Sequence, residues 1–228
     1  MRLTAEGISK EYLRENAAAG TNRFCAVRET SLTLEPGTVT VLTGRSGSGK
    51  TTLLHMLGGL SEPGSGRVLL GDTDLYALPD KQRSALRNRE FGIIPQGQTA
   101  LHSLTAAENI LLPCYLSGEK PDLAFAEELM QRLDISALRD ARPAALSGGE
   151  LRRVAIARAL IRRPSVILAD EPTGDLDDEN TKTVFGLLKE TAEAGAAVLI
   201  VTHETDAAQY ADRQYRMQSG ALTEPDAP

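Results

Sequence analysis

The sequence predicts an α/β fold with a mainly parallel sheet, and three observations support that prediction. Short apolar runs rich in β-branched residues alternate with longer helical patterns along the 228 residues. A glycine-rich stretch, residues 44–51, stands between an apolar strand pattern and an apolar helix pattern. A further apolar strand, residues 166–169, ends in the acids Asp170 and Glu171. The length allows one large domain with a substantial core, or two small ones.

The first elements expected along the chain are strands, which are joined by turns such as the one at residues 35–37. The first of them are expected to form a small antiparallel subdomain that leads into the glycine-rich stretch. Residues 15–23, with three alanines, a glycine and two asparagines, predict an exposed hairpin tip, and residues 221–228 a loose end. The strands expected are residues 3–9, 31–34, 38–42, 66–70, 91–94, 166–169, 197–201 and 213–217.

Helical patterns, with no convincing strand, dominate residues 99–163. This change predicts a helical subdomain at about residues 99–163, inserted into a core of about residues 1–98 and 164–220. The arginine-rich residues 81–89 are expected to be a solvated helix face. The helices expected in the insertion are residues 105–111, 123–133 and 149–162, punctuated by Pro113, Pro121, Pro143 and Pro164.

Composition argues against several classes of function. The 25 basic and 31 acidic residues give a net charge of −6, which disfavours a nucleic-acid-binding surface. No apolar run approaches the roughly 18 residues needed to cross a bilayer, and residues 1–6 carry no export signal. Cys25 and Cys114 match no metal-binding or redox spacing. We therefore expect a cytoplasmic protein that binds no nucleic acid.

Residues 44–51 fit the phosphate-loop pattern G-x-x-x-x-G-K-[ST]. Glycines let the backbone wrap around a polyphosphate with its N–H groups inward, and the following helix aims its positive end at the same charge. Lys50 is expected to reach the β- and γ-phosphates, and the Thr51 hydroxyl to hold Mg²⁺. A glycine-rich turn without a ligand is the alternative. The nucleotide-binding residues expected here are Gly44, Arg45, Ser46, Gly47, Ser48, Gly49, Lys50, Thr51 and Thr52.

The acids that follow the strand at residues 166–169 predict a metal ligand and a base. A buried strand tolerates an acid at its end only when the acid has a partner such as a metal ion or water. Asp170 is therefore expected to hold Mg²⁺. Glu171 is expected to orient and deprotonate the water that attacks the γ-phosphate. An exposed Asp-Glu turn is the alternative.

A third segment, Leu-Ser-Gly-Gly-Glu at residues 146–150, predicts a second anion-binding helix start. Ser147 is a favourable N-cap, and the glycines that follow leave the first N–H groups accessible. Taken alone, the segment is explained equally well as a simple capped helix. Its presence beside the two earlier segments favours the anion-binding interpretation.

Together the three segments resemble the ATP-binding subunits of ABC transporters over almost the whole chain. Residues 44–51 resemble the family's Walker A motif, residues 146–150 its signature motif, and residues 166–171 its Walker B motif with the catalytic glutamate. Residues 174–177 resemble its D-loop. The resemblance further assigns Gln96 as the Q-loop glutamine, His203 as the switch histidine, Asp177 in the D-loop, Ser147, Gly148 and Gly149 in the signature, and Tyr12 as the ring that stacks on adenine. For Tyr12, the alternative is a partly buried tyrosine at the end of a strand.

The resemblance implies a P-loop NTPase core of the RecA type, with ATP and Mg²⁺ as ligands, and a head-to-tail homodimer. Each ATP would be clamped between the Walker A loop of one copy and the signature helix of the other. Ser147 and Gly149 would donate to the γ-phosphate bound by the other copy, and His203 would contact the same phosphate from its own side. Asp177 would report across the interface. Gln96 would be a third metal ligand, beside Thr51 and Asp170, and a catalytic residue that links the metal site to the helical subdomain.

Four longer stretches resemble one branch of the family, which serves lipoprotein release, macrolide efflux, peptide-antibiotic resistance and cell division. They are residues 53–66, 105–113, 146–160 and 168–177. In that branch the membrane partner often transmits motion rather than carrying a substrate. The chain departs from the family pattern where Pro95 replaces a commoner aromatic and Gly97 follows Gln96. It departs again where Leu151 and Arg152 stand at positions usually filled by more polar or glutamine residues.

The resemblance also implies an ATPase that lies on the inner face of the cell membrane and drives a separately encoded transmembrane subunit. Leu101, Leu104 and Ile110 lie in a stretch that resembles the groove for that partner, with ordinary helical core as the alternative. A cytosolic ATP switch that regulates a partner without moving a substrate is the alternative function. A small-molecule kinase would explain neither residues 146–150 nor His203.

Overall fold

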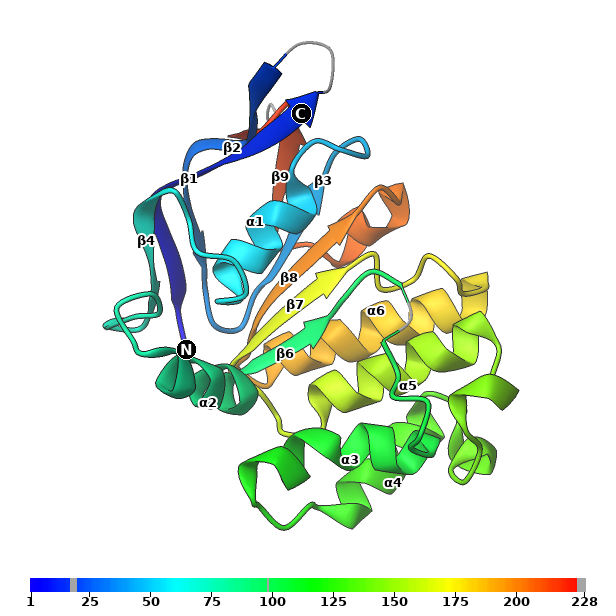
Figure 1. Cartoon of the computed structure of the whole chain (residues 1–228). Coiled ribbons are helices and arrows are strands. Elements are labelled where there is room, and N and C mark those ends of the chain that lie inside the picture. Colours follow the sequence, from blue (N-terminus) through cyan, green and yellow to red (C-terminus); the bar gives the residue numbers. More distant parts are fainter. Residues whose placement is uncertain (17–19, 98, 225–228) are drawn as a thin grey trace.

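Two sheets form the framework of the chain in the computed structural model, which describes residues 1–16, 20–97 and 99–224 (Figure 1). The first sheet is antiparallel throughout, with strand order β2-β1-β4-β5. It is the antiparallel subdomain that the sequence predicts. Its strands are β1 (Leu3–Asn16), β2 (Gly20–Leu34), β4 (Ser65–Leu70) and β5 (Thr73–Asp74).

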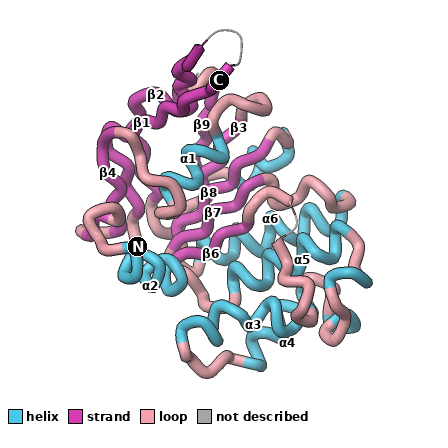
Figure 2. The backbone as a smooth tube through the Cα atoms, in the orientation of Figure 1, coloured by secondary structure: helices cyan, strands magenta, loops and turns pink. Residues whose placement is uncertain are grey.

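The second sheet is parallel except at one edge and has the order β10-β9-β3-β8-β7-β6. Only the pair β9 and β10 is antiparallel. Figure 2 shows the two sheets as separate sets of strands, with helices on the face of the parallel sheet that is turned away from the antiparallel sheet. The strands are β3 (Val39–Thr43), β6 (Phe91–Ile94), β7 (Val166–Asp170), β8 (Ala197–Thr202), β9 (Arg213–Gln218) and β10 (Ala221–Thr223).

Helix α1 (Lys50–Leu57) lies between the two sheets and supplies the centre of one core (Figure 1). Its leucines pack against Leu3 and Ile8 of the antiparallel sheet and against Leu168 of the parallel sheet. Alternate residues of a strand face opposite sides, so Ile167 joins a second core under the remaining helices. Strand β7 is buried on both faces, as expected for an interior strand of a parallel sheet.

The second core is covered by helices that follow β6 and β7 in sequence. Between β6 and β7, the described residues contain helices and no strand, which agrees with the helical pattern of the sequence. Helix α2 has no buried residue, in line with a solvated face. The helices are α2 (Asp80–Glu90), α3 (Ala106–Ser117), α4 (Leu123–Arg132), α5 (Gly148–Leu160) and α6 (Asp178–Glu193), with short 3₁₀ turns at Ser136–Leu138, Pro143–Ala145 and Thr205–Tyr210.

One buried side chain shapes the loop that connects β6 to α3. Asn109 is fully buried, and its Oδ1 accepts from the N–H of Leu101 at 2.8 Å. Its Nδ2 donates to the carbonyl groups of Leu101, Leu104 and Thr105. Leu101 remains 47% exposed, whereas Ile110 is fully buried. Ile110 therefore fits the alternative of ordinary helical core, whereas Leu101 stays exposed.

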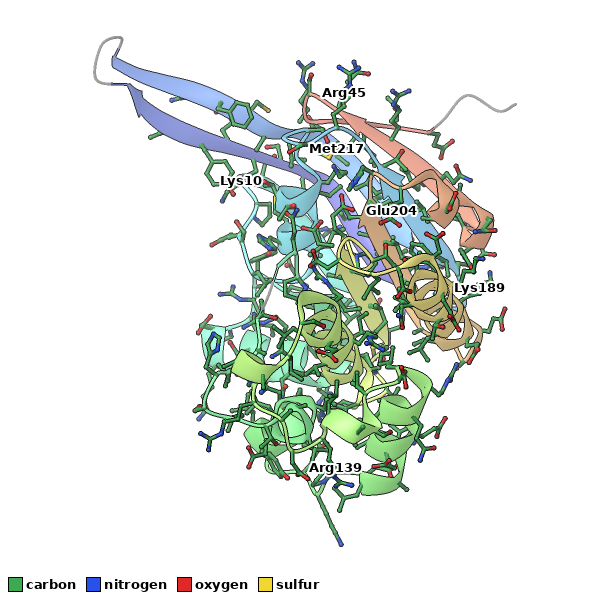
Figure 3. The ribbon with its side chains drawn as sticks, turned by 90° about the vertical axis from the view of Figure 1, so that its right-hand side faces the viewer. Lys10, Arg45, Arg139, Lys189, Glu204 and Met217 are labelled. Atoms are coloured by element: carbon green, nitrogen blue, oxygen red, sulfur yellow. The ribbon has the colours of Figure 1, made fainter. Side chains whose placement is uncertain are left out.

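Several element bounds differ from the sequence-based expectation. Strand β1 continues to Asn16 and strand β2 begins at Gly20, so much of the expected tip at residues 15–23 is strand. Residues 17–19 lie outside the described part. Figure 3 shows these strands projecting beyond the rest of the molecule. Helix α3 continues through Pro113, and residues 221–223 pair with β9 instead of being loose. No helix in the described ranges has the length and apolar character that a bilayer requires.

Candidate functional site

Four parallel strands end side by side, and their ends form the floor of a cleft. The registers pair Thr43 with Thr202, Asp170 with Val201, and Ile94 with Ala169, so the loops that follow leave from one edge of the sheet. Ligands of open α/β sheets bind at that edge. The cleft has a volume of about 570 Å³ and is lined by Phe24, Ala26, Arg45, Ser46, Gly47, Gly49, Lys50, Thr51, Thr52, Gln96, Asp170, Glu171 and His203.

The phosphate loop owes its shape to close contacts with two other strands. Gly44 and Gly49 have φ values of +158° and +109°. A Cβ atom on Gly49 would come within 2.1 Å of the carbonyl oxygen of Ala26, and one on Gly44 within 2.4 Å of that of Met217. Arg45 and Met217 lie close together at this end of the molecule (Figure 3). Only glycine allows the loop to pass so near to β2 and β9.

Lys50 begins α1 and points back into the loop. Its ammonium group donates to the carbonyl oxygens of Gly44 at 2.7 Å and Arg45 at 3.2 Å, and the residue is only 8% exposed. The N-cap is Gly49, so no side chain bonds the first amides of the helix. A positive charge and open N–H groups thus face the same space, as an anion-binding site requires.

Two of the three residues predicted to hold a metal, Thr51 and Asp170, are in direct contact. The Thr51 hydroxyl donates to Oδ2 of Asp170 at 2.7 Å, and Asp170 is buried. Burial raises the pKa of Asp170, while the Thr51 hydrogen bond and Lys50 act in the opposite direction. Hydroxyl and carboxylate oxygens are the donors that Mg²⁺ prefers, so these residues fit that ion. Gln96, the third predicted ligand, is exposed and lines the same cleft.

Glu171 is held in a strained and fully bonded conformation. Its φ is +49°, which is unusual for a residue with a side chain, and its N–H donates to the carbonyl of Val201 at 2.8 Å. Oε2 accepts from the Thr202 hydroxyl at 3.0 Å. Oε1 lies 2.8 Å from Nδ1 of His203. Thr202, which no sequence motif indicated, therefore helps to orient the predicted base.

His203 reaches the cleft from the end of β8, and its side chain is 71% exposed. The hydrogen bond and the charge of Glu171 raise the pKa of His203 above its ordinary value, and Glu204 adds a smaller effect in the same direction. In this arrangement the imidazole binds the predicted base. The two groups predicted to act on the γ-phosphate are therefore paired with each other.

The signature segment forms a helix start that does not line the cleft. Ser147 caps α5: its N–H donates to Oε2 of Glu150 at 2.7 Å, and its Oγ accepts from the N–H of Glu150 at 3.3 Å. Gly149 packs closely on the next segment, since a Cβ there would lie 3.1 Å from the carbonyl oxygen of Asp175. Ser147, Gly148 and Gly149 are thus absent from the residues that the cleft brings together.

Asp177 also serves as a helix cap and lies outside the cleft lining. Its Oδ1 accepts from the N–H of Asn180 at 2.8 Å at the start of α6. Hydrogen bonds from the backbone and the side chain of Asn180 hold the pKa of Asp177 below its usual range. The segment that carries Asp177 packs against the start of α5 through Gly149, so both predicted partner-facing motifs form one surface.

The aromatic ring in the cleft is Phe24, whereas Tyr12 is not among the lining residues. The two residues pair directly across β1 and β2, so they lie on the same face of the hairpin. Tyr12 is 41% exposed, with the Lys10 ammonium 5.6 Å from its ring centre. Phe24 could be recognised only with the register of the hairpin, which the sequence does not specify.

Comparisons with known proteins agree with this geometry. The family model described as ABC transporter matches residues 27–174. The chain is 42% identical over 201 residues to the lipoprotein-releasing system ATP-binding protein LolD of Shewanella denitrificans, covering 87% of this chain and 86% of that protein. It is 41% identical over 228 residues to the LolD protein of Shewanella oneidensis, covering 99% and 97%.

Solved structures with the same fold are ABC transporter cassettes. The dimeric structure of MJ0796, described as a bacterial ABC transporter cassette, matches with a TM-score of 0.88 and 28% identity, over 99% of this chain and 100% of that chain. A dimeric post-hydrolysis state of MJ0796 bound to ADP and Pi matches with the same values. The chain described here therefore belongs to the ABC transporter family and is an ATP-binding, ATP-hydrolysing subunit.

Proposed function

We propose that two copies of this chain close head to tail around Mg·ATP, hydrolyse it, and so drive a separate membrane subunit. One observation carries this proposal: the cleft gathers Lys50, Asp170, Glu171 and His203, but the second anion-binding helix start, at Ser147, lies outside it. A cleft that lacks part of its phosphate-binding groups is completed when a second copy supplies them. ATP then acts as the link between the copies, and hydrolysis breaks that link.

Each residue of the cleft has a task that follows from its position. Lys50 leaves the loop carbonyls and pairs with the β- and γ-phosphates. Glu171 orients the attacking water and takes its proton, which requires that the contact with His203 be released. His203 then donates to the γ-phosphate, while Ser147 of the second copy donates from the other side. Catalysis consists mainly of positioning and charge stabilisation.

The Mg²⁺ ion belongs to the same proposal. Thr51 and Asp170 would hold it, with Gln96 at the rim of the cleft, because their oxygens suit a hard divalent cation. When bound, the ion supplies positive charge that neutralises the phosphate oxygens. We also propose Tyr12, beside Phe24, as a contact for the adenine base, and residues 99–163 as a subdomain that moves against the core.

We assign the membrane partner to the lipoprotein-releasing class, because the two named relatives carry that description at about 40% identity. The chain would then lie at the cytoplasmic face of the membrane, bound to a transmembrane subunit. The exposed Leu101, in the loop held by Asn109, is available for this contact. A switch that regulates a partner without moving a substrate would use the same dimer but would not act with such a subunit.

The test uses the variant Glu171→Gln, which should hydrolyse ATP about 10²–10³-fold more slowly than the wild type because it lacks a general base. Saturation with Mg·ATP should convert it to a stable dimer, measured by light scattering. Glu204→Gln is the matched control, since Glu204 accepts a hydrogen bond from Thr173 and does not line the cleft.

Two results would contradict the proposal. One is a Glu171→Gln variant that hydrolyses ATP at the wild-type rate. The other is a variant that stays monomeric with saturating Mg·ATP, even when the membrane subunit encoded with it is supplied. Co-purification with that subunit, followed by ATPase assays with and without it, tests the assignment to a transporter separately.

A further inference from the structure

A single buried guanidinium group joins two loops on either side of helix α5. Arg152 is only 4% exposed although it carries a full positive charge. Its Nη1 donates to the carbonyl oxygen of Pro95 at 2.6 Å. Its Nη2 lies 3.7 Å from Oδ2 of Asp175, which is half exposed. A buried arginine needs partners for its charge and its N–H groups, and here Nη1 has a hydrogen bond and Nη2 an ion pair, whereas Nε is buried without a hydrogen-bond partner.

The two loops that Arg152 contacts carry residues with different tasks. Pro95 directly precedes Gln96, which lines the nucleotide cleft. Asp175 lies two residues before Asp177, in the segment on which Gly149 of the signature packs. One loop thus belongs to the cleft of this copy, and the other belongs to the surface that a second copy would meet.

Arg152 and Pro95 are also positions at which the sequence departs from the family pattern. The structure brings these two departures into direct contact. A glutamine at position 152 would have no charge and a shorter side chain, so it could not hold both a carbonyl and a carboxylate in this way. Lysine has a single ammonium group and lacks the planar fork that reaches two partners. The contact therefore depends on the arginine side chain.

We propose that Arg152 is a positioning residue that makes the Gln96 loop and the Asp175–Asp177 segment move as one unit. It does not touch the nucleotide. It transmits the state of the cleft in one copy to the surface that completes the cleft of the other. The proposal rests on the proposed function, because it assumes that hydrolysis takes place between two copies.

Arg162 provides a matched comparison within the same chain. Its side chain is only 8% exposed, and it donates to the carbonyl oxygen of Asn88 at 2.7 Å and to Oε1 of Glu119 at 2.5 Å. Neither partner lines the nucleotide cleft or belongs to the signature or D-loop segments. Loss of Arg162 should therefore remove the same kinds of bond with no effect on the coupling of the two loops.

The experiment compares Arg152→Gln, Asp175→Asn, the double variant and Arg162→Gln with the wild type. Arg152→Gln should lower kcat about fivefold and leave KM for ATP within about twofold, since the cleft that binds the nucleotide is intact. Adding Asp175→Asn to Arg152→Gln should lower kcat no further, because the link is already broken. Arg162→Gln should reduce Tm by an amount similar to that of Arg152→Gln while kcat stays within about twofold of the wild type.

Three outcomes would overturn the proposal: an unchanged kcat for Arg152→Gln, effects of the two single variants that multiply in the double variant, or an equal loss of kcat in Arg162→Gln. A failure of the proposed function would give different measurements. In that case the wild type itself shows no ATP hydrolysis that depends on Glu171, and Glu171→Gln forms no dimer with ATP. The two failures are therefore distinguishable in one set of preparations.

Discussion

The chain contains two glycine-rich helix starts of similar composition, but they are in opposite states. Helix α1 begins after Gly49 with no side-chain cap, so its first amides face the cleft together with the ammonium group of Lys50. Helix α5 begins after Ser147, whose backbone and hydroxyl groups are bonded to Glu150 in a capping box. At the first start no side chain bonds the cap, whereas at the second the cap residue is already bonded to the Glu150 carboxylate.

This difference explains why the two starts play unequal parts in binding. An anion at α1 meets groups that have no other side-chain partner at that cap, so one copy suffices for affinity. An anion at α5 meets the Glu150 carboxylate beside the cap, whose negative charge opposes binding, so we expect it to bind there only when a second copy holds it in place. Nucleotide binding should therefore depend on α1, and closure of the dimer on α5.

The largest expected effect is on α1. Lys50→Ala should weaken ATP binding about 10- to 100-fold, because it removes charge-assisted hydrogen bonds to the phosphates. Isothermal calorimetry with Mg·ATP measures this loss. Lys182→Ala, at an exposed position of α6 outside the cleft, should bind ATP as the wild type does. An unchanged affinity in Lys50→Ala would remove the distinction between the two helix starts.

A smaller effect is expected at α5. Ser147→Ala should leave ATP affinity within about twofold and lower kcat about tenfold, since its hydroxyl acts only in the closed dimer. It should also cost about 1 kcal/mol of stability through loss of the cap. Thr105→Ala is the control, because Thr105 and Glu108 form the same capping box on α3. Equal kinetics in the two variants would show that Ser147 is only a cap.

The smallest expected effect is a shift in the titration of His203. Its pKa, measured by NMR in the nucleotide-free protein, should lie above the ordinary value and should fall in Glu171→Gln. Glu204→Gln should produce a smaller decrease, since the influence of Glu204 is weaker. The contact stabilises the fold below the ordinary pKa of the imidazole and loses its charged component as the pH rises through the raised pKa of His203. No difference between Glu171→Gln and the wild type would exclude the contact.

Periodicity and motifs predicted the layout of the fold because they act locally. The strand–loop–helix at residues 39–57 and the buried strand β7 were recognisable, since each has a strong apolar pattern and a distinctive end. The strand ends then converge because parallel strands share one edge. The convergence of the phosphate loop, Asp170, Gln96 and His203 therefore agrees with the sequence analysis, while their roles remain proposals.

The features that sequence reasoning missed depend on contacts between distant segments. Pro113 was expected to end a helix, yet α3 continues to Ser117, because the buried Cys114 continues the apolar face that packs on the core. Helix α6 was not predicted, since its sequence is rich in polar residues. Phe24 reaches the cleft only through the register of a long hairpin. Such pairings are decided by tertiary packing.

The left-handed backbone at Glu171 has a consequence for selection on this chain. Only glycine adopts that conformation without strain, and the strain amounts to about 1–3 kcal/mol. A laboratory screen for heat tolerance alone would thus favour the loss of the carboxylate that we propose as the general base. Under that proposal, selection for stability favours glycine at position 171, whereas selection for turnover favours glutamate.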